Sequence, residues 1–137
     1  MDCIFCKIIK NEIPAAKVYE DDDVLAFLDV APLTKGHCLV IPKTHYENIF
    51  DIDQAALQKV IIATQHVAEK IKNILQADGI RLSQSNGKAA GQEVMHFHLH
   101  IIPRYQDDGI DMSMTQTSHL LKVNFKALEE LALKINS

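Results

Sequence analysis

The sequence predicts an α+β fold: a five-stranded antiparallel sheet with one long helix packed on it and short helices near both termini. Short apolar runs separated by turn residues recur between positions 17 and 102, which is typical of antiparallel strands. One apolar stripe with helical periodicity predicts the long helix. The chain has 137 residues, 47% of them hydrophobic and 23% charged, which suits a single globular domain over 1–137.

Charge and composition exclude several classes of partner. The formal net charge of −4 argues against nucleic acid, because duplex binding relies on many Lys and Arg contacts. No apolar run approaches the roughly 20 residues of a membrane span, so no membrane partner is expected. The first residues lack the charged and then apolar pattern of a signal peptide. Three cysteines in such a chain indicate reduced thiols and a cytoplasmic location.

The N-terminal stretch contains a CxxC pair, Cys3 and Cys6, in a predicted short helix that ends near Asn11 and Pro14. Three interpretations compete. A redox dithiol would normally follow a strand in a βαβ unit, and none precedes residue 3. The two thiols could instead be small hydrophobes in a core, or half of a zinc site completed by two histidines from elsewhere.

Three apolar runs at close spacing predict an antiparallel meander. The predicted strands are 17–20, 24–29 and 37–41. The acidic turn 21–23 separates the first two, the turn 31–36 separates the next two, and Pro42 stops the third.

The long helix is predicted from about 53 to 76, roughly 35 Å at 1.5 Å per residue. Its apolar stripe comprises Ala56, Val60, Ala63, Val67, Ile71 and Ile74. Asp51 with Gln54 resembles a capping box at the start, and Gly79 suits the exit. His66 lies off the centre of the stripe and is expected at the surface.

The remaining chain continues the alternation of strand and helix. A strand is predicted over 80–84, followed by a loop over 85–92 whose glycines could point N–H groups at an anion or simply make a hairpin. The segment 105–114 has no clear period and is expected to be irregular. A short C-terminal amphipathic helix is marked by Phe125, Leu128, Leu131 and Ile135.

A predicted strand over 95–102 carries three histidines at strict alternation, His96, His98 and His100. Side chains two apart in a strand share a face, so the three imidazoles would line one face about 6–7 Å apart. Phe97, Leu99 and Ile101 would anchor the other face in a core. Imidazoles can accept protons, bind metal or attack phosphorus. The alternative is a polar face whose histidines only form hydrogen bonds.

The stretch from Gly91 to Pro103 closely resembles the signature of the histidine triad (HIT) superfamily, three histidines alternating with apolar residues. The upstream segments 25–29 and 36–43, with Pro32 and His45, resemble its Hint-type branch in order and spacing. The resemblance covers residues 3 to about 105 and leaves a tail and helix over 106–137. It implies a HIT-like fold and a homodimer with the sheets joined edge to edge.

The resemblance implies hydrolysis at the α-phosphorus of purine nucleoside phosphoramidates, releasing AMP or GMP through a covalent nucleotidyl-histidine. By position, His98 matches the nucleophile, while His100 and His37 match the histidines near the phosphate and leaving group. No cofactor is needed for this chemistry. The positions that match nucleotide contacts are Phe27, Asp29, Val30, Ser85, Asn86, Gly91 and Gln92.

Zinc-bearing relatives in the superfamily imply a separate role for His96. The matching ligand positions are Cys3, Cys6, His45 and His96, a Cys₂His₂ set of the kind that holds structural zinc. The metal would pin the N-terminus beside the catalytic strand. Cys38 is not in this set and is taken as a strand residue.

Other functions stay open at this level. One is a dinucleoside polyphosphate hydrolase of the neighbouring branch. Another is a nucleotide-binding regulatory or scaffold protein whose hydrolysis is incidental, and a third is a zinc-binding structural module. The sequence leaves the physiological leaving group and the choice between adenine and guanine undetermined.

Overall fold

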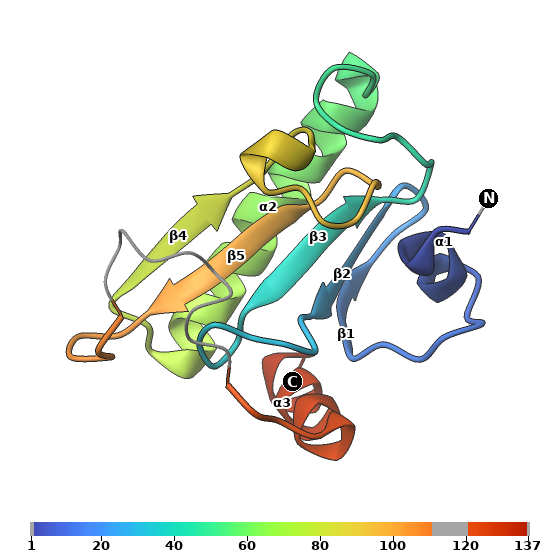
Figure 1. Ribbon diagram of the computed structural model, residues 1–137. Coiled ribbons are helices and arrows are strands. Elements are labelled where there is room, and N and C mark those ends of the chain that lie inside the picture. The colour runs from blue at the N-terminus through green and yellow to red at the C-terminus, as the bar shows by residue number, and fades with distance from the viewer. Residues whose placement is uncertain (1, 111–120, 137) are drawn as a thin grey trace.

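A computed structural model describes residues 2–110 and 121–136 of the chain (Figure 1). A five-stranded sheet has the order β1-β2-β3-β5-β4, and every pair of neighbours is antiparallel. The elements are α1 (Ile4–Ile9), β1 (Lys17–Glu20), β2 (Val24–Leu28), β3 (Cys38–Pro42), α2 (Gln54–Leu75), β4 (Gly79–Ser83), the 3₁₀ turn η1 (Lys88–Ala90), β5 (Leu99–Arg104) and α3 (Phe125–Asn136). The predicted α+β class, the five antiparallel strands and the long helix are therefore confirmed.

Both faces of the sheet are covered near its centre. The long helix α2 lies behind the sheet in Figure 1, whereas α1 lies to the right of β1 and β2 and packs on β2 and β3 through Phe5 and Ile8. Every residue of β2 and β3 is buried, because alternate side chains enter two different apolar clusters. Val40 packs toward α2 and α3, whereas Leu39 and Ile41 pack toward α1. This burial on both faces explains why these strands read as continuous apolar runs.

The strand predicted over 95–102 begins only at Leu99 and continues to Arg104. The ladder between β3 and β5 starts at the pair Val40 and Leu99, so His96 and His98 precede it. They lie in a lead-in segment where the Phe97 N–H donates to the Tyr46 carbonyl at 2.7 Å. The predicted alternation survives, since Phe97 enters the core shared with α2 while the histidines contact the α1 side.

The ends of α2 differ from the sequence prediction. Asp53 is the N-cap and accepts from the Ala55 N–H, whereas Asp51 accepts from the N–H groups of Glu47 and Asn48 in the preceding turn. The predicted capping box with Gln54 is therefore wrong. Gln76, with φ of 52°, closes the helix in the left-handed conformation. Gly79 instead begins β4.

The other boundaries agree closely. The second, third and fourth strands are displaced from their predicted limits by a residue at most at each end. His66 is exposed on α2, as predicted, with its ring 5.7 Å from that of Tyr19. Residues 105–110 are irregular, and the rest of the predicted irregular segment, 111–114, lies outside the described residues. Within 2–110 and 121–136, no helix has both the length and the apolar character that crossing a membrane requires.

The C-terminal helix α3 packs on β1 and α2 through one apolar face. Leu128 on this face is 5% exposed, while Leu133 of the same helix is 71% exposed. We expect Leu128→Ala to lower the free energy of unfolding by about 2–5 kcal/mol, because it leaves a cavity in the core. Leu133→Ala is the matched control and should change it by less than about 0.5 kcal/mol. Urea denaturation of both variants measures this; equal effects would show that α3 does not dock as described.

Candidate active site

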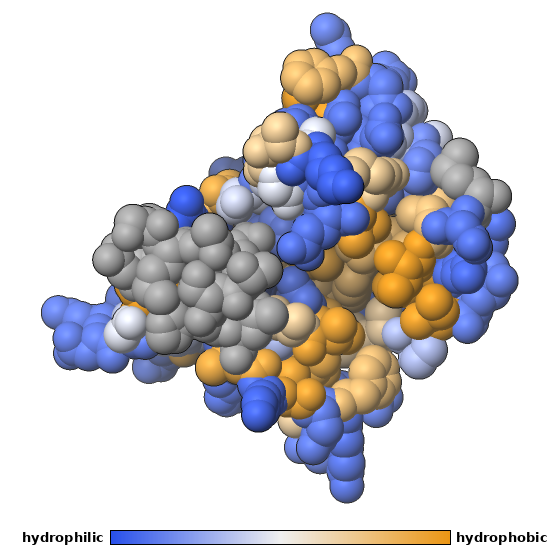
Figure 2. Space-filling view, in the orientation of Figure 1, coloured by the Kyte–Doolittle hydropathy of each residue, from blue (hydrophilic) through white to orange (hydrophobic). Residues whose placement is uncertain are grey.

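A cavity of about 270 Å³ lies on the α1 side of the sheet. Apolar residues of α1 form one wall, Phe27 and Val30 lie at the end of β2, and the segment from Gly91 to Val94 forms the rim. Two of the three alternating histidines, His98 and His100, also line it. Figure 2 shows hydrophobic side chains gathered around a hollow on this face, beside α1. An apolar cavity with a few converging polar groups is the usual form of a small-molecule site.

The His98 ring has a fixed tautomer. Its Nδ1 lies 2.7 Å from the His96 carbonyl oxygen, which can only accept a hydrogen bond. Nδ1 therefore carries the proton and donates it, which leaves the lone pair on Nε2. Burial is the main cause that lowers the His98 pKa below its usual value, so the ring is neutral at pH 7. A neutral imidazole with a free Nε2 lone pair is a competent nucleophile.

His37 and His100 form a hydrogen-bonded chain with one consistent set of tautomers. The Leu33 N–H donates to His37 Nδ1 at 2.9 Å, so His37 carries its proton on Nε2. His37 Nε2 lies 3.0 Å from His100 Nδ1 and donates to it. The neutral His100 must then carry its own proton on Nε2. A backbone amide on the 31–36 turn thus determines which nitrogen of His100 can donate.

Asp29 lies beside this chain and lines the cavity. One carboxylate oxygen accepts from the Ala31 N–H at 2.9 Å, and the other lies 3.5 Å from His37 Nε2. Burial raises the pKa of this carboxyl above its usual value. Asp29, His37 and His100 have ligand atoms within 4.8 Å of one another, which would suit a metal by proximity alone. Their mutual hydrogen bonds already satisfy the facing nitrogens, so we interpret the group as a proton-handling chain.

Within the loop 85–92, the N–H groups of Gly87, Ala90, Gly91 and Gln92 form hydrogen bonds inside the loop. The Gly91 N–H donates to the Lys88 carbonyl, within the 3₁₀ turn. The Gln92 side chain is buried and bonds only to backbone: its oxygen accepts from the Gly87 N–H, and its nitrogen donates to the carbonyls of Glu47 and Val94. The predicted contacts of Gly91 and Gln92 with a nucleotide stay a prediction, and in the structure these groups bond within the protein.

Asn86 also has its amide engaged within the protein. Its oxygen accepts from the Ile49 N–H at 2.7 Å and from the Gln84 side chain. Its nitrogen donates to the oxygen of Gln84. Neither Asn86 nor Ser85 lines the cavity, whereas Gly91 does. Ser85 lies behind Gly91, since a Cβ added at Gly91 would meet its hydroxyl at 3.9 Å.

Sequence reasoning missed the wall that α1 contributes. Ile4, Phe5 and Ile8 line the cavity, and the Phe5 ring stands edge-on to those of Phe27 and His98. The spacing of Ile4 and Ile8 around the CxxC pair gave an amphipathic signal, but a helix this short could not be placed against the sheet from sequence. Glu93 at the rim was missed as well, because nothing distinguishes it from other loop carboxylates.

The four residues predicted to hold zinc converge beside the cavity. Cys3 Sγ lies 3.4 Å from His96 Nδ1, Cys6 Sγ lies 3.4 Å from His45 Nδ1, and the two Nδ1 atoms are 3.1 Å apart. Tetrahedral zinc with bonds of about 2.0–2.3 Å places its ligands roughly 3.3–3.8 Å from one another. His96 Nε2 donates to the Pro42 carbonyl, which directs the lone pair of Nδ1 into the group. The donor set therefore fits zinc.

Comparison with known proteins gives the family. The HIT domain model matches residues 10–107. A curated relative, Protein hit of Bacillus subtilis, is 50% identical over 104 residues, which are 76% of this chain and 72% of that protein. Adenylylsulfatase HINT3 of Arabidopsis thaliana is 39% identical over 126 residues, 92% of this chain and 64% of that protein. The chain belongs to the HIT domain family.

Solved structures agree. A Hit-like protein of Bartonella henselae is 46% identical, with a TM-score of 0.86 over 98% of this chain and 95% of that one. A zinc-bound histidine triad family protein of Mycobacterium smegmatis is 34% identical, with a TM-score of 0.83 over 99% and 91% of the two chains. A HIT family hydrolase of Clostridium thermocellum is 38% identical, with a TM-score of 0.67 over 83% and 96%. The predicted HIT-like fold is confirmed.

The tautomers of His37 and His100 can be measured by ¹⁵N NMR on histidine-labelled protein. We expect the proton on Nε2 in both rings, and no titration between pH 7.5 and about 5, because burial lowers their pKa values to about 4 and about 3. In the unfolded chain both rings would take up protons near pH 6.5, so the free energy of unfolding should fall as pH drops from about 6.5 toward 4. A proton on His37 Nδ1, or titration near 6.5, would contradict the described chain.

Proposed function

We propose that the protein is a hydrolase that acts at the α-phosphorus of purine nucleoside phosphoramidates and releases AMP or GMP. The observation that carries this proposal is the hydrogen bond from His98 Nδ1 to the His96 carbonyl, which leaves Nε2 as a nucleophile in the cavity. The likeness to a HIT family hydrolase and to an adenylylsulfatase supports hydrolysis of a nucleotide substrate.

In the first step, His98 Nε2 attacks the α-phosphorus, and the P–N bond to the amine breaks. The departing amine nitrogen takes up one proton from solvent as this bond breaks, while His100 donates a hydrogen bond to the phosphate through the proton on its Nε2. The result is an amine and a nucleotidyl-histidine whose Nδ1 proton stays bonded to the His96 carbonyl. A displacement split in this way has two lower barriers.

In the second step, water attacks the same phosphorus and releases its proton to solvent. The bond between phosphorus and His98 Nε2 breaks, and the nucleoside monophosphate leaves. His37 keeps the His100 ring oriented through the 3.0 Å hydrogen bond. No step requires a cofactor.

The nucleoside is proposed to fill the apolar part of the cavity. Phe27 and Val30 would contact the purine together with the α1 wall, and Asp29 would accept hydrogen bonds from the ribose hydroxyls. Ser85, Asn86, Gly91 and Gln92 are proposed to contact the ribose and phosphate, as their matching positions imply, while their hydrogen bonds within the protein hold the rim loop in shape.

Cys3, Cys6, His45 and His96 are proposed to hold one structural zinc ion. A closed Cys₂His₂ set supplies structural stabilisation to the segments it joins and no open position for substrate. Such a site needs reduced thiols, which supports the proposed cytoplasmic location.

The direct test is hydrolysis of adenosine 5′-phosphoramidate by wild type and His98→Ala, with AMP followed by chromatography. We expect His98→Ala to lose on the order of 10³-fold or more in kcat, since it removes the nucleophile. His66→Ala on the exposed face of α2 is the control and should keep wild-type activity. Adenylyl sulfate and diadenosine triphosphate are tested in parallel; turnover of only one of these would replace the phosphoramidate assignment.

If His98→Ala keeps its activity, the proposed nucleophile is wrong. If wild type turns over none of the substrates but binds AMP, the protein is a nucleotide-binding module and the enzyme proposal fails.

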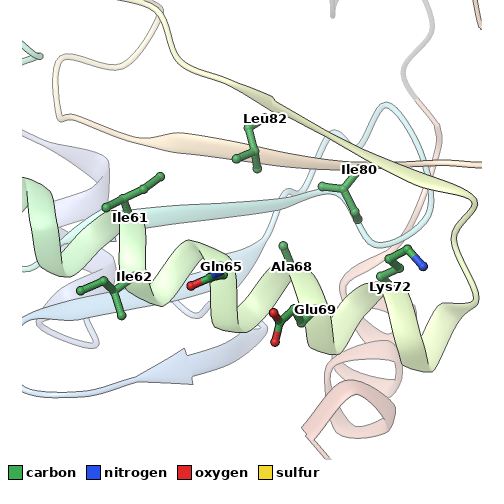
Figure 3. Close-up of a pocket in the computed structure, with 8 residues that line it drawn as sticks. All are labelled: Ile61, Ile62, Gln65, Ala68, Glu69, Lys72, Ile80 and Leu82. Carbon is green, nitrogen blue, oxygen red and sulfur yellow. The ribbon is translucent and has the colours of Figure 1, made fainter.

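A homodimer is also proposed, through the groove between α2 and the edge strand β4 (Figure 3). This groove of about 500 Å³ has apolar walls, and Ile61, Ile62 and Leu82 in it are exposed. Glu69 and Lys72 also line it, so that two copies related by a twofold axis could pair unlike charges. An unpaired strand edge next to an exposed apolar patch is a favourable surface for self-association.

Light scattering after size exclusion tests the dimer. Wild type should elute at about twice the chain mass of 15.4 kDa. Ile62→Lys should shift it to one chain mass, because two lysines would be buried in an apolar contact. Leu133→Lys, an equally exposed position on α3, should leave the dimer intact. A wild-type monomer, or a dimer that Ile62→Lys does not affect, would refute this interface.

A further inference from the structure

We propose that Phe5 and His96 are positioning residues that couple the Cys3, Cys6, His45 and His96 centre to the nucleotide cavity. Nucleotide affinity would then depend on this centre, although no side chain of its four residues lines the cavity. The inference rests on the proposed nucleotide site. It goes beyond a structural zinc site, because it assigns to the centre control over the nucleophile and over one wall of the pocket.

The first connection runs through His96, which serves both sites at once. Its Nδ1 lies in the four-residue centre, and its Nε2 donates to the Pro42 carbonyl at 2.9 Å. Its backbone carbonyl accepts from His98 Nδ1 at 2.7 Å. His96 is completely buried, so ring and carbonyl move together. The orientation of the ring therefore sets the position of the atom that fixes the tautomer of His98.

The second connection runs through α1, whose two cysteines flank Phe5. Cys3 is the N-cap of the helix and Cys6 lies in its first turn. Phe5 contacts the ring of His98 edge-on, with centroids 5.2 Å apart and planes at 86°, and contacts Phe27 at 5.5 Å. A six-residue helix is not stable by itself in water, so its place depends on what attaches it to the sheet.

Without a cation, the four-residue centre attaches α1 to the sheet only weakly. His96 donates through Nε2, so the lone pair of its Nδ1 faces His45 Nδ1 at 3.1 Å and the two sulfur atoms. Without a cation, the two cysteines join the histidines only through sulfur hydrogen bonds of 3.4–3.7 Å, which are weak because a thiol is a weak donor. A bound cation would turn this cluster into the strongest attachment of α1. Without one, we expect α1 and Phe5 to leave the cavity wall while the core on the α2 face persists.

The test compares zinc-loaded wild type, the same protein after dialysis against a chelator, Cys6→Ala and Phe5→Ala. Zinc content is measured by mass spectrometry of the metal, AMP affinity by calorimetry, and exposure of α1 and α2 by hydrogen exchange. Chelated wild type and Cys6→Ala should bind AMP about tenfold or more weakly, with faster exchange over 4–9 and unchanged exchange over 60–71. Added zinc should restore wild type but not Cys6→Ala.

Phe5→Ala distinguishes the contribution of the cavity wall to AMP affinity from the contribution of the metal. This variant should keep one zinc per chain and retain slow hydrogen exchange over 60–71, yet bind AMP more weakly. AMP affinity within twofold of the loaded protein after zinc removal would overturn the proposal. So would loss of protection over 60–71 on zinc removal, because the centre would then support the whole fold. Zinc-dependent AMP binding without phosphoramidate turnover would leave this inference standing while the proposed reaction failed.

Discussion

The site depends on one hydrogen bond, from His98 Nδ1 to the backbone carbonyl of His96. The carbonyl can only accept, so the bond fixes the tautomer of the imidazole and directs its lone pair into the cavity. This backbone partner lies two residues earlier, in the lead-in segment that the bond from the Phe97 N–H to the Tyr46 carbonyl holds in place. Apolar residues between the histidines keep this segment in the core, so packing and chemistry require the same alternation.

A backbone group also orders the second pair of rings. The Leu33 N–H fixes His37, and His37 fixes His100, so every proton in the chain has a determined place. Both sets of rings reach the cavity. His98 contributes its Nε2 lone pair there, and His100 contributes its Nε2–H group. Side chains alone would leave four combinations of tautomer for two neutral rings, whereas the fold allows one.

Much of this arrangement was predictable from sequence, because the repeats of two and of three to four residues directly report strands and helices. The metal set was predicted correctly as a cluster, but from the resemblance to zinc-bearing relatives, since the CxxC spacing alone left three interpretations open. The hydrogen bonds of the Gln92 side chain to backbone groups were not predicted, because an amide side chain has the same sequence signal whether it contacts a ligand or the backbone. The place of α1 was also missed, since a short helix has no sequence signal for the surface on which it docks. The N-cap of α2 was also predicted wrongly, because Asp51 and Asp53 are both of a residue type that caps helices.

The central claim is that the Nε2 atom of His98 forms a bond to phosphorus during turnover. Alkaline quenching within the first turnover, which preserves an acid-labile P–N bond, followed by intact mass measurement and peptide sequencing, tests it most directly. We expect one adenylyl group per chain, attached to the peptide that contains 96–100 and located on His98, decaying at the rate at which AMP appears. Turnover with no adduct, or an adduct on a residue other than His98, would contradict it.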